Sequence, residues 1–483
     1  MHENTRPLEY EGSITFHASL APSSRAREPL YRLLCPWRLT APRSRVIFIR
    51  RIGKGAFAFM PLWSTPKSPI AERVAQQHAS IVGTEPTHVA SAPATWPLIG
   101  EHIDHYGGIV AASLSDLRAA AAVSSRKDGI VSVHYVPAIG EPAHDSIGLQ
   151  EVAALAAAQQ PTTDSEGQPV IPPAPEGRLA ARIGGIVHTM VNRQLLSRET
   201  AGADITIVSD IPNDIGLGAA SAADVAVALA LMGPTDNLDA PLRVRVADVC
   251  TQAVTTFAHK PALRARHTAA LRSSGDGVCI IDYADGSVTH APHVVDQDVV
   301  AFTVAVPGNT AEEQSQAIDS IRQRQQFVDD ACHSFGTESL RLLPDAQQRV
   351  VEWLKAVHKV YGEEGRPSIN AATEWMAFYE EETSRVENFV RYLRSHRRNE
   401  LFPIILQSQA SLTNIYGFDS AEKLAELVTV RGAVAARSAH AGLSGAVIAY
   451  VPSNRAENFA ADLADDGFLL VKLAAGEPAK VED

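Results

Sequence analysis

The sequence has few cysteines and no long apolar run, and each shortage excludes a class of protein. The four cysteines among its 483 residues are Cys35, Cys250, Cys279 and Cys332, which are scattered and show no paired metal-ligand spacing. This pattern indicates neither a zinc site nor a disulfide scaffold, so a reducing cytoplasm is the expected compartment. Because no apolar run approaches the ~18–20 residues that a membrane-spanning helix needs, we expect no membrane partner.

Composition and charge further narrow the class of protein and its partners. Hydrophobic residues make up 45% and charged residues 20% of the chain, which is ordinary for a folded protein with sizeable cores. At roughly 150 residues per domain, the length indicates two to three domains or one large two-lobed body. The net charge of −12 combines +6 on residues 1–59 with −18 on the remainder. An acidic body of this size argues against nucleic acid as a partner.

Residues 1–59 form a basic N-terminal extension without sustained periodicity. They lack the apolar core and cleavage site of a targeting peptide, and no aromatic residues alternate with the basic ones as in a nucleic-acid arm. We favour the interpretation that this stretch is translated upstream sequence and that the working protein begins at Met60. A real, partner-binding basic arm is the alternative, and the mass of the native N-terminus distinguishes the two.

The remaining chain alternates between strand-like and helix-like patterns. Periodicity predicts strands at 130–136, 204–208, 278–283, 299–306 and 447–451, and helices at 179–197, 222–231, 312–335 and 345–360. The Pro-rich stretch 159–176 predicts a surface loop or insertion. Mixed strands followed by long helices predict an α+β fold with an N-terminal lobe at 60–300 and a C-terminal lobe at 301–483.

Polar residues gather in a glycine-flanked turn at residues 98–108, which read LIGEHIDHYGG. Glu101, His102 and Asp104 lie within four residues of one another. Carboxylates accept hydrogen bonds from vicinal hydroxyls, so this cluster suits a polyhydroxyl ligand. The alternative interpretation is a helix cap with an adjacent surface histidine.

Two small-residue segments have the composition of ligand loops. Residues 209–221 place a loop between a predicted strand and a predicted helix, where free backbone N–H groups can bind phosphate. The loop is no Walker A sequence, because no Gly-Lys-Ser/Thr follows. Residues 441–446, AGLSGA, allow close backbone approach before a strand. A tight turn and a loop before a buried strand are the respective alternatives.

In this order, the three segments resemble the galactokinase branch of the GHMP small-molecule kinases. Residues 98–108 resemble LIGEHTDYNGG, residues 212–221 resemble the phosphate loop PxGxGLSSSA, and residues 441–446 resemble GAGFGGC. Residues 250–261 are similar to the region before the family's catalytic aspartate, and residues 407–412 are similar to its ESHxSL helix. The resemblance extends over roughly residues 85–475.

The resemblance implies a two-lobed fold with its ligands in the cleft between the lobes. It implies the family reaction, transfer of the γ-phosphoryl group of Mg-ATP to galactose to give galactose 1-phosphate. Glu101, His102 and Asp104 would bind the sugar. The implied nucleotide-binding residues are Gly216, Leu217, Gly218, Ala219, Ala220 and Ser221. The implied cofactors are therefore ATP and Mg²⁺, and the partner is a galactose-like sugar.

The departures from the family pattern fall on its catalytic groups. Thr95 stands where the family has an arginine that stabilises the transferring charge, and Arg266 where it has the catalytic aspartate. Val254 and Ala220 replace residues that help to bind magnesium. Asp214 replaces a loop glycine, where it could cap the following helix but would repel a phosphate.

These replacements predict impaired phosphoryl transfer. A guanidinium cannot accept the sugar's proton, and valine cannot coordinate a hard cation, so no protein metal ligand and no catalytic residue is assigned. Activity could be rescued if Arg266 supplied the charge missing at Thr95. It could also be rescued if Arg264, Arg266 and His267 attracted an acidic sugar, or if His267 served as the base. The alternative for these three residues is a solvated basic strip.

Two functions follow. The first is a galactokinase-type sugar kinase with impaired catalysis. The second is a catalytically inactive sugar- or nucleotide-binding pseudokinase with a regulatory role.

Overall fold

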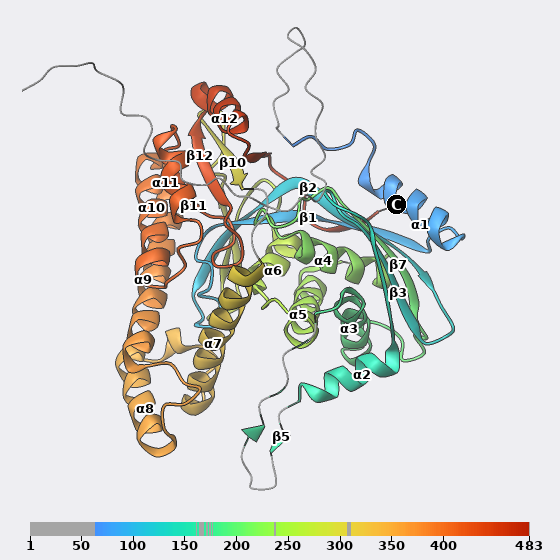
Figure 1. Ribbon diagram of the computed structural model, residues 1–483, viewed down its shortest axis with the longest axis horizontal. Helices are drawn as coiled ribbons and strands as arrows, with labels where there is room; N and C mark the ends of the chain where they lie inside the picture. The colour runs from blue at the N-terminus through green and yellow to red at the C-terminus, as the bar shows by residue number, and fades with distance from the viewer. Residues whose placement is uncertain are drawn as a thin grey trace, which may run out of the picture. The chain divides into compact units, whose positions relative to one another are not determined.

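The computed structural model describes residues 63–482, except 161, 164–168, 171, 173, 174, 176, 236, 237 and 307–310. The predictions for residues 1–59 therefore lie outside the described residues. Two mixed units of strand and helix follow one another along the chain (Figure 1). The predicted α+β class is confirmed.

The first sheet has eight strands and carries the N-terminal part of the fold. They are β1 (His88–Ile99), β2 (Ile109–Ser125), β3 (Ile130–Val136), β4 (Ala143–Gly148), β7 (Ala203–Ser209), β8 (Gly277–Asp282), β9 (Val288–Pro292) and β14 (Lys480–Glu482). Their order is β14-β1-β2-β7-β3-β4, with β8 paired to β2 and β9 to β8. β3 and β7 are parallel and the other pairs are antiparallel. Because β14 pairs with β1, residues 480–482 belong to the first sheet rather than to the lobe predicted for 301–483.

Helices cover both faces of this sheet, as alternation along β2 requires. Ala120 and Ala122 pack against Ile70 and Val74 of α1 (Ile70–Val82) on one face. The alternate residues of β2 face a larger core, to which α4 (Ala219–Met232) contributes a nearly continuous run of small apolar side chains. The other helices of this unit are α2 (Leu149–Ala158), α3 (Leu179–Asn192), α5 (Ala240–Phe257) and α6 (Arg264–Arg272). Since both faces are covered at the centre of the sheet, β1, β2 and β7 are buried along almost all of their length.

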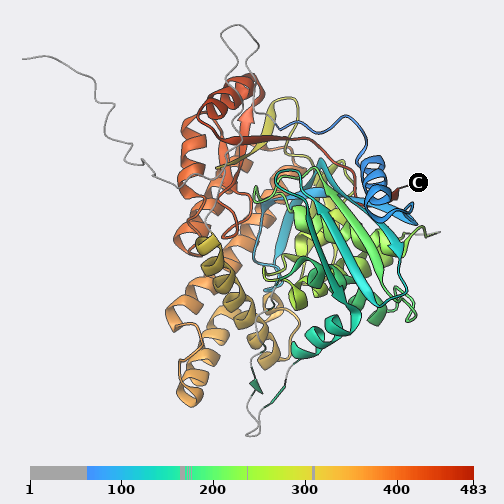
Figure 2. The same ribbon diagram turned by 45° about the vertical axis from the view of Figure 1, so that its right-hand side comes forward.

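The second sheet is antiparallel and has the order β11-β12-β10-β13. Its strands are β10 (Val299–Ala305), β11 (Ala435–Ser438), β12 (Val447–Pro452) and β13 (Leu469–Leu473). The accompanying helices are α7 (Ala311–Phe335), η1 (Leu340–Leu342), α8 (Ala346–Tyr361), α9 (Ile369–Arg394), α10 (Arg398–Asn414), α11 (Glu422–Val430), η2 (Ser453–Arg455) and α12 (Ala456–Asp465). A separate apolar core lies between this sheet and the helices α11 and α12. In Figure 2 the helices α7, α9 and α10 run alongside one another beside the first sheet.

The predicted elements occur close to their expected bounds. The predicted helix 179–197 ends earlier, at Asn192, and the predicted loop 159–176 contains the short paired strands β5 (Thr162–Thr163) and β6 (Pro169–Val170). The small-residue loop predicted between strand and helix joins β7 to α4. Across the described part of the chain, every helix is too short or too polar to span a bilayer.

Candidate functional site

Glu101 lies in the turn between β1 and β2, and its carboxylate is held by protein groups on both oxygens. Oε2 accepts a hydrogen bond of 2.9 Å from the backbone N–H of Ala441, and Oε1 lies 3.3 Å from Nη2 of Arg266. Nη1 of Arg437 is 3.8 Å from Oε2. Glu101 is 4% exposed, so this carboxylate joins the two sheets' loops in a buried ionic cluster.

His102 joins the first motif to the third. Its backbone has φ 73°, a left-handed conformation that places the side chain across the turn. Nε2 lies 2.8 Å from the carbonyl oxygen of Ala441 and therefore carries the proton, because a carbonyl only accepts. The ring packs against Tyr416 and Phe418. Burial lowers the pKa of His102, so the imidazole is neutral and fixed.

Asp104 keeps one oxygen available. Its Oδ2 is 3.3 Å from Nε of Arg264, and Arg264 also donates to the backbone carbonyl of Asp104. Oδ1 is buried and has no hydrogen-bond partner among the residues that the structure describes. Burial raises the pKa of Asp104, but the charges of His105 and Arg264 outweigh it and hold the pKa below its ordinary value. An ionised carboxylate with an unpaired oxygen can accept a hydrogen bond from a ligand.

Arg266 occupies the centre of the site. The guanidinium donates to the carbonyl of Thr95 at 2.7 Å and to that of Ala439 at 2.9 Å, in addition to its contact with Glu101. It is 5% exposed, and burial lowers its pKa below the ordinary value of an arginine side chain. The interpretation as a solvated basic strip is therefore wrong for Arg266. Its buried guanidinium connects α6 through hydrogen bonds to β1 and to the loop after β11.

A second buried cluster lies next to it on α3, α4, α5 and α6. Asp224 accepts hydrogen bonds from Nε of Arg182 at 2.8 Å and from Nε2 of His267 at 3.1 Å. Nδ1 of His267 is 3.1 Å from Oγ1 of Thr251. Burial raises the pKa of Asp224, but Arg182 and His267 outweigh it and hold the carboxylate ionised. Because both ring nitrogens of His267 are engaged and the ring is 1% exposed, His267 is not available as the catalytic base.

The predicted phosphate loop borders an open cavity of about 320 Å³. Two glycines shape the loop: a Cβ on Gly216 would come within 2.4 Å of Ala439, and one on Gly218 within 3.0 Å of Thr95 Oγ1. Both have positive φ, which glycine adopts without strain. Gly218 precedes α4, which has no side-chain cap, so its first N–H groups are free of a capping side chain.

Asp214 therefore does not cap α4, contrary to the expectation from the sequence; it lies 3.5 Å from Nζ of Lys260 instead. The cavity is lined by all six predicted nucleotide-binding residues. The other lining residues are Arg182, Pro212, Asn213, Asp214, Val254, Lys260, Pro261, Ala262, Leu263, Arg266, His267, His440 and Leu443.

A second, narrow cavity lies on the other side of Arg266 and measures about 20 Å³. Its lining contains the three predicted sugar-binding residues. The full set is Thr95, Trp96, Pro97, Glu101, His102, Asp104, Val110, Ala112, Leu263, Ala265 and Arg266. This volume is that of about one water molecule, whereas small-molecule pockets usually have about 300–1,000 Å³. The structure thus brings the predicted sugar residues together around a small space that Arg266 also lines.

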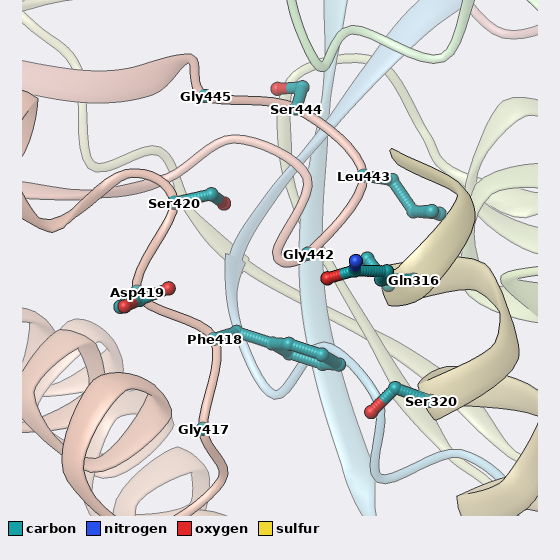
Figure 3. Close-up of a pocket in the computed structure, with 11 residues that line it drawn as sticks. Gln316, Ser320, Gly417, Phe418, Asp419, Ser420, Gly442, Leu443, Ser444 and Gly445 are labelled. Carbon is teal, nitrogen blue, oxygen red and sulfur yellow. The ribbon is translucent and has the colours of Figure 1, made fainter. Parts of the chain in front are cut away.

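A third cavity of about 360 Å³ lies between α7 and the third motif (Figure 3). Figure 3 shows Gln316 and Ser320 of α7 at the right, residues 417–420 at the left with the ring of Phe418 pointing toward α7, and Ser444 and Gly445 at the top. The same Phe418 packs against His102. The third motif therefore contacts the sugar turn on one side and borders this cavity on the other.

A buried polar cluster that contacts the turn at Gly100 was not predicted from the sequence. Oε1 of Glu382 accepts a hydrogen bond of 3.1 Å from the N–H of Gly100 and one of 2.5 Å from Ser408 Oγ. Arg437 donates to Ser408 Oγ at 2.9 Å. Glu382 and Arg437 are at most 1% exposed. The signal that could have found Arg437 is a single charged residue within an otherwise uncharged strand, and Asp224 in the Ala-rich α4 carries the same signal.

Magnesium finds few suitable ligands in the open cavity. Asp214 is the only carboxylate among the described residues that line it, and the side chains of Val254 and Ala220 are aliphatic. No group of three or more histidine, cysteine or acidic residues that could hold a metal occurs in the described part of the chain. Because Mg²⁺ is usually held by one or two carboxylates and Asp214 is already paired with Lys260, this lining fits the metal poorly.

Comparisons with known proteins agree with this geometry. The galactokinase galactose-binding signature matches residues 76–125, which contain the turn at Glu101. Galactokinase of Streptomyces coelicolor is 24% identical over 385 residues, covering 79% of this chain and 89% of the relative. Galactokinase of Chloroflexus aurantiacus is 32% identical over 145 residues, covering 30% and 31%.

The solved structure of Lactococcus lactis galactokinase complexed with galactose is similar in fold, with a TM-score of 0.63. Its sequence is 15% identical, and the match covers 85% of this chain and all of that one. The chain thus carries the galactokinase galactose-binding signature and is similar in fold to this galactokinase. Its α+β fold has two lobes, as the resemblance implied. The galactose-binding signature supports a small-molecule sugar as the ligand class.

Proposed function

We propose that this galactokinase-like chain binds a nucleotide in its open cavity and phosphorylates galactose with strongly impaired catalysis. The reaction concerned is that of the family, ATP-dependent conversion of galactose to galactose 1-phosphate. The observation that carries the proposal is Arg266, whose guanidinium lies between the two cavities, where the family resemblance implies the catalytic aspartate. A guanidinium stays protonated, so it cannot take the proton of the sugar hydroxyl.

The residues that remain support binding better than transfer. In the proposal, Asp104 accepts a hydrogen bond from the sugar through its unpaired Oδ1, and Glu101 and His102 shape the turn. The N–H groups at the start of α4, with Gly216 to Ser221, hold the phosphates. Arg266 borders both cavities and supplies the positive charge that Thr95 lacks, which supports the predicted compensation. For the family's magnesium, the described lining of the cavity offers one carboxylate, Asp214, which is paired with Lys260.

A catalytically inactive sugar- or nucleotide-binding pseudokinase with a regulatory role is the second candidate. The volume of about 20 Å³ beside Glu101 favours it, because this space is too small for a sugar without rearrangement of its lining. In both candidates the partner is a small molecule, and the cytoplasmic location stays a prediction.

Phosphate transfer from Mg-ATP to galactose tests the proposal, with protein starting at Met60 and a confirmed galactokinase as reference. We expect a rate at least 10³-fold below the reference, because an arginine clamp and a general base are each worth roughly 10²–10⁴-fold or more. A rate near the reference that is lost in Arg266→Ala would refute impairment and identify a site rebuilt around Arg266. No turnover in a folded sample that binds galactose by calorimetry would favour the pseudokinase.

A further inference from the structure

The open cavity presents cationic side chains where the family resemblance implies a divalent metal. We propose that the nucleotide binds there without magnesium, so that free ATP is preferred to its magnesium complex. This proposal rests on the proposed nucleotide binding in this cavity. In addition, it assigns the neutralisation of the phosphate charge to cationic side chains of the lining. It concerns binding alone and is independent of whether phosphate is transferred to a sugar.

The cations come from three different helices or loops and share one lining. Lys260 belongs to the loop between α5 and α6, and its side chain is 43% exposed. Arg266 on α6 lies directly under the phosphate loop, since a Cβ on Gly218 would meet its Nη1 at 3.1 Å. Arg182 on α3 also lines the cavity. Arginine and lysine can each neutralise phosphate oxygens directly.

The three cationic side chains differ in how freely they can bind a phosphate, because each already has protein partners. Arg182 is committed to the buried Asp224, and Arg266 shares Glu101 with other donors. Among the described residues, Lys260 forms an ion pair only with the exposed Asp214, at 3.5 Å, and an exposed pair of this kind is weak. Lys260 is therefore the cation that a phosphate can recruit most easily.

Two orphaned polar atoms point independently to a ligand beside the start of α4. Nε of Arg266 and Oγ1 of Thr95 are buried and lack hydrogen-bond partners among the described residues. Both side chains lie against Gly218, the residue that precedes α4. Buried polar groups are normally satisfied, so an oxygen-rich group at this place would complete them. A hydrated metal would instead meet positive charge and the aliphatic side chains of Val254 and Ala220.

Calorimetric titration with ATP, in EDTA and in excess magnesium chloride, tests the inference on the chain starting at Met60. We expect ATP to bind more tightly in EDTA than in magnesium chloride, because magnesium neutralises the phosphate charge that the cations contact. Equal or tighter binding in magnesium overturns the inference, as does the absence of binding in both buffers. The titrations contain no galactose, so failure of the kinase proposal is measured separately.

Variants make the test specific to the lining. Lys260→Met should weaken ATP binding in EDTA about tenfold, whereas Lys472→Met on β13, outside the cavity, should leave it unchanged. The double variant Val254→Glu with Ala220→Ser introduces oxygen ligands and should make magnesium favourable for binding. Equal affinities of the Lys260 and Lys472 variants would overturn the role of the cations.

Discussion

The two cavities that meet at Arg266 differ sharply, although one family resemblance predicts both. The cavity beside the phosphate loop is open at about 320 Å³, whereas the one beside the sugar turn measures about 20 Å³. The lining of the first combines the small residues 216–221 with charged side chains such as Lys260. In the second, Glu101 and Arg266 pair with each other among mainly apolar neighbours.

The difference shows how substitution of one catalytic residue reorganises a site. An aspartate beside Glu101 would repel it, whereas Arg266 attracts it and also bonds to two backbone carbonyls. The carboxylate that the motif offers to a sugar becomes part of an internal ion pair. The phosphate loop has no ionisable side chain between Ile215 and Ser221, so it cannot form a comparable internal ion pair.

The largest expected effect comes from reversing the substitution pair. Thr95→Arg combined with Arg266→Asp restores the family's arrangement of an arginine and a general base. We expect the rate of phosphate transfer from Mg-ATP to galactose to rise at least tenfold over the unchanged chain. Arg266→Asp alone is the control, since it places two carboxylates together without a cation and should show no gain. Equal rates in all three proteins would contradict the assignment of these positions.

Removing the buried side chain of Arg266 should strongly lower the free energy of unfolding. Arg266→Met leaves Glu101 buried without its nearest cation, and breaking a buried pair in this way costs about 3–5 kcal/mol. The matched control is Arg431→Met, whose ion pairs with Asp462 and Asp466 lie at the surface, so that its loss of stability should be much smaller. Urea unfolding followed by circular dichroism measures both; similar losses would show that the Arg266 cluster is not a special tie.

Acidification should weaken the fold in a window set by the buried histidines of both cavities. Burial lowers the pKa of His102, and burial with the charge of Arg266 lowers that of His440. The unfolded chain takes up these protons near pH 6.5 while the folded chain does not, so stability falls as the pH drops below 6.5. Each group contributes at most about 1.4 kcal/mol per pH unit.

Unfolding midpoints at pH 7.5, 6.5 and 5.5 measure this dependence. His102→Asn keeps a residue that tolerates positive φ but removes the titrating ring, so its midpoints should change less with pH. An unchanged slope in this variant would exclude His102 as a contributor. The pKa values of Asp104 and Asp224 are lowered, so their contribution to stability is lost only when the pH falls below about 3.8. The effect of the histidines near pH 6.5 can therefore be measured separately from that of the aspartates.

The smallest expected effect concerns the open cavity. Asp214→Asn removes a negative charge from the lining and releases Lys260, which should tighten ATP binding about threefold at low salt. The gain should shrink at 1 M salt because exposed charges are screened. Asp419→Asn, in the third cavity, is the control. Weaker binding in the Asp214 variant would indicate that this carboxylate assists the ligand.

The sequence predicted the elements well because their signals are local. Alternation and helical spacing placed β3, β7, β10 and α8 within a few residues, and small residues marked the loop before α4. The β14 strand was not predicted, since three residues form a strand only through their pairing with β1. Lys260 was likewise unremarkable in sequence, and only the packing of its loop places it in the cavity.

The sequence by itself determined the fold class, the order of the motifs and the identity of the replaced residues, because these depend on residue type and spacing. The tertiary structure alone decided that Arg266 is buried, that His267 has both nitrogens engaged and that Asp214 faces Lys260 rather than capping α4. These facts depend on groups more than 15 residues apart in the chain, and for Arg266 and Ala439 on a separation of 173 residues. Whether a charge is solvated or paired follows from such contacts, which no local pattern encodes.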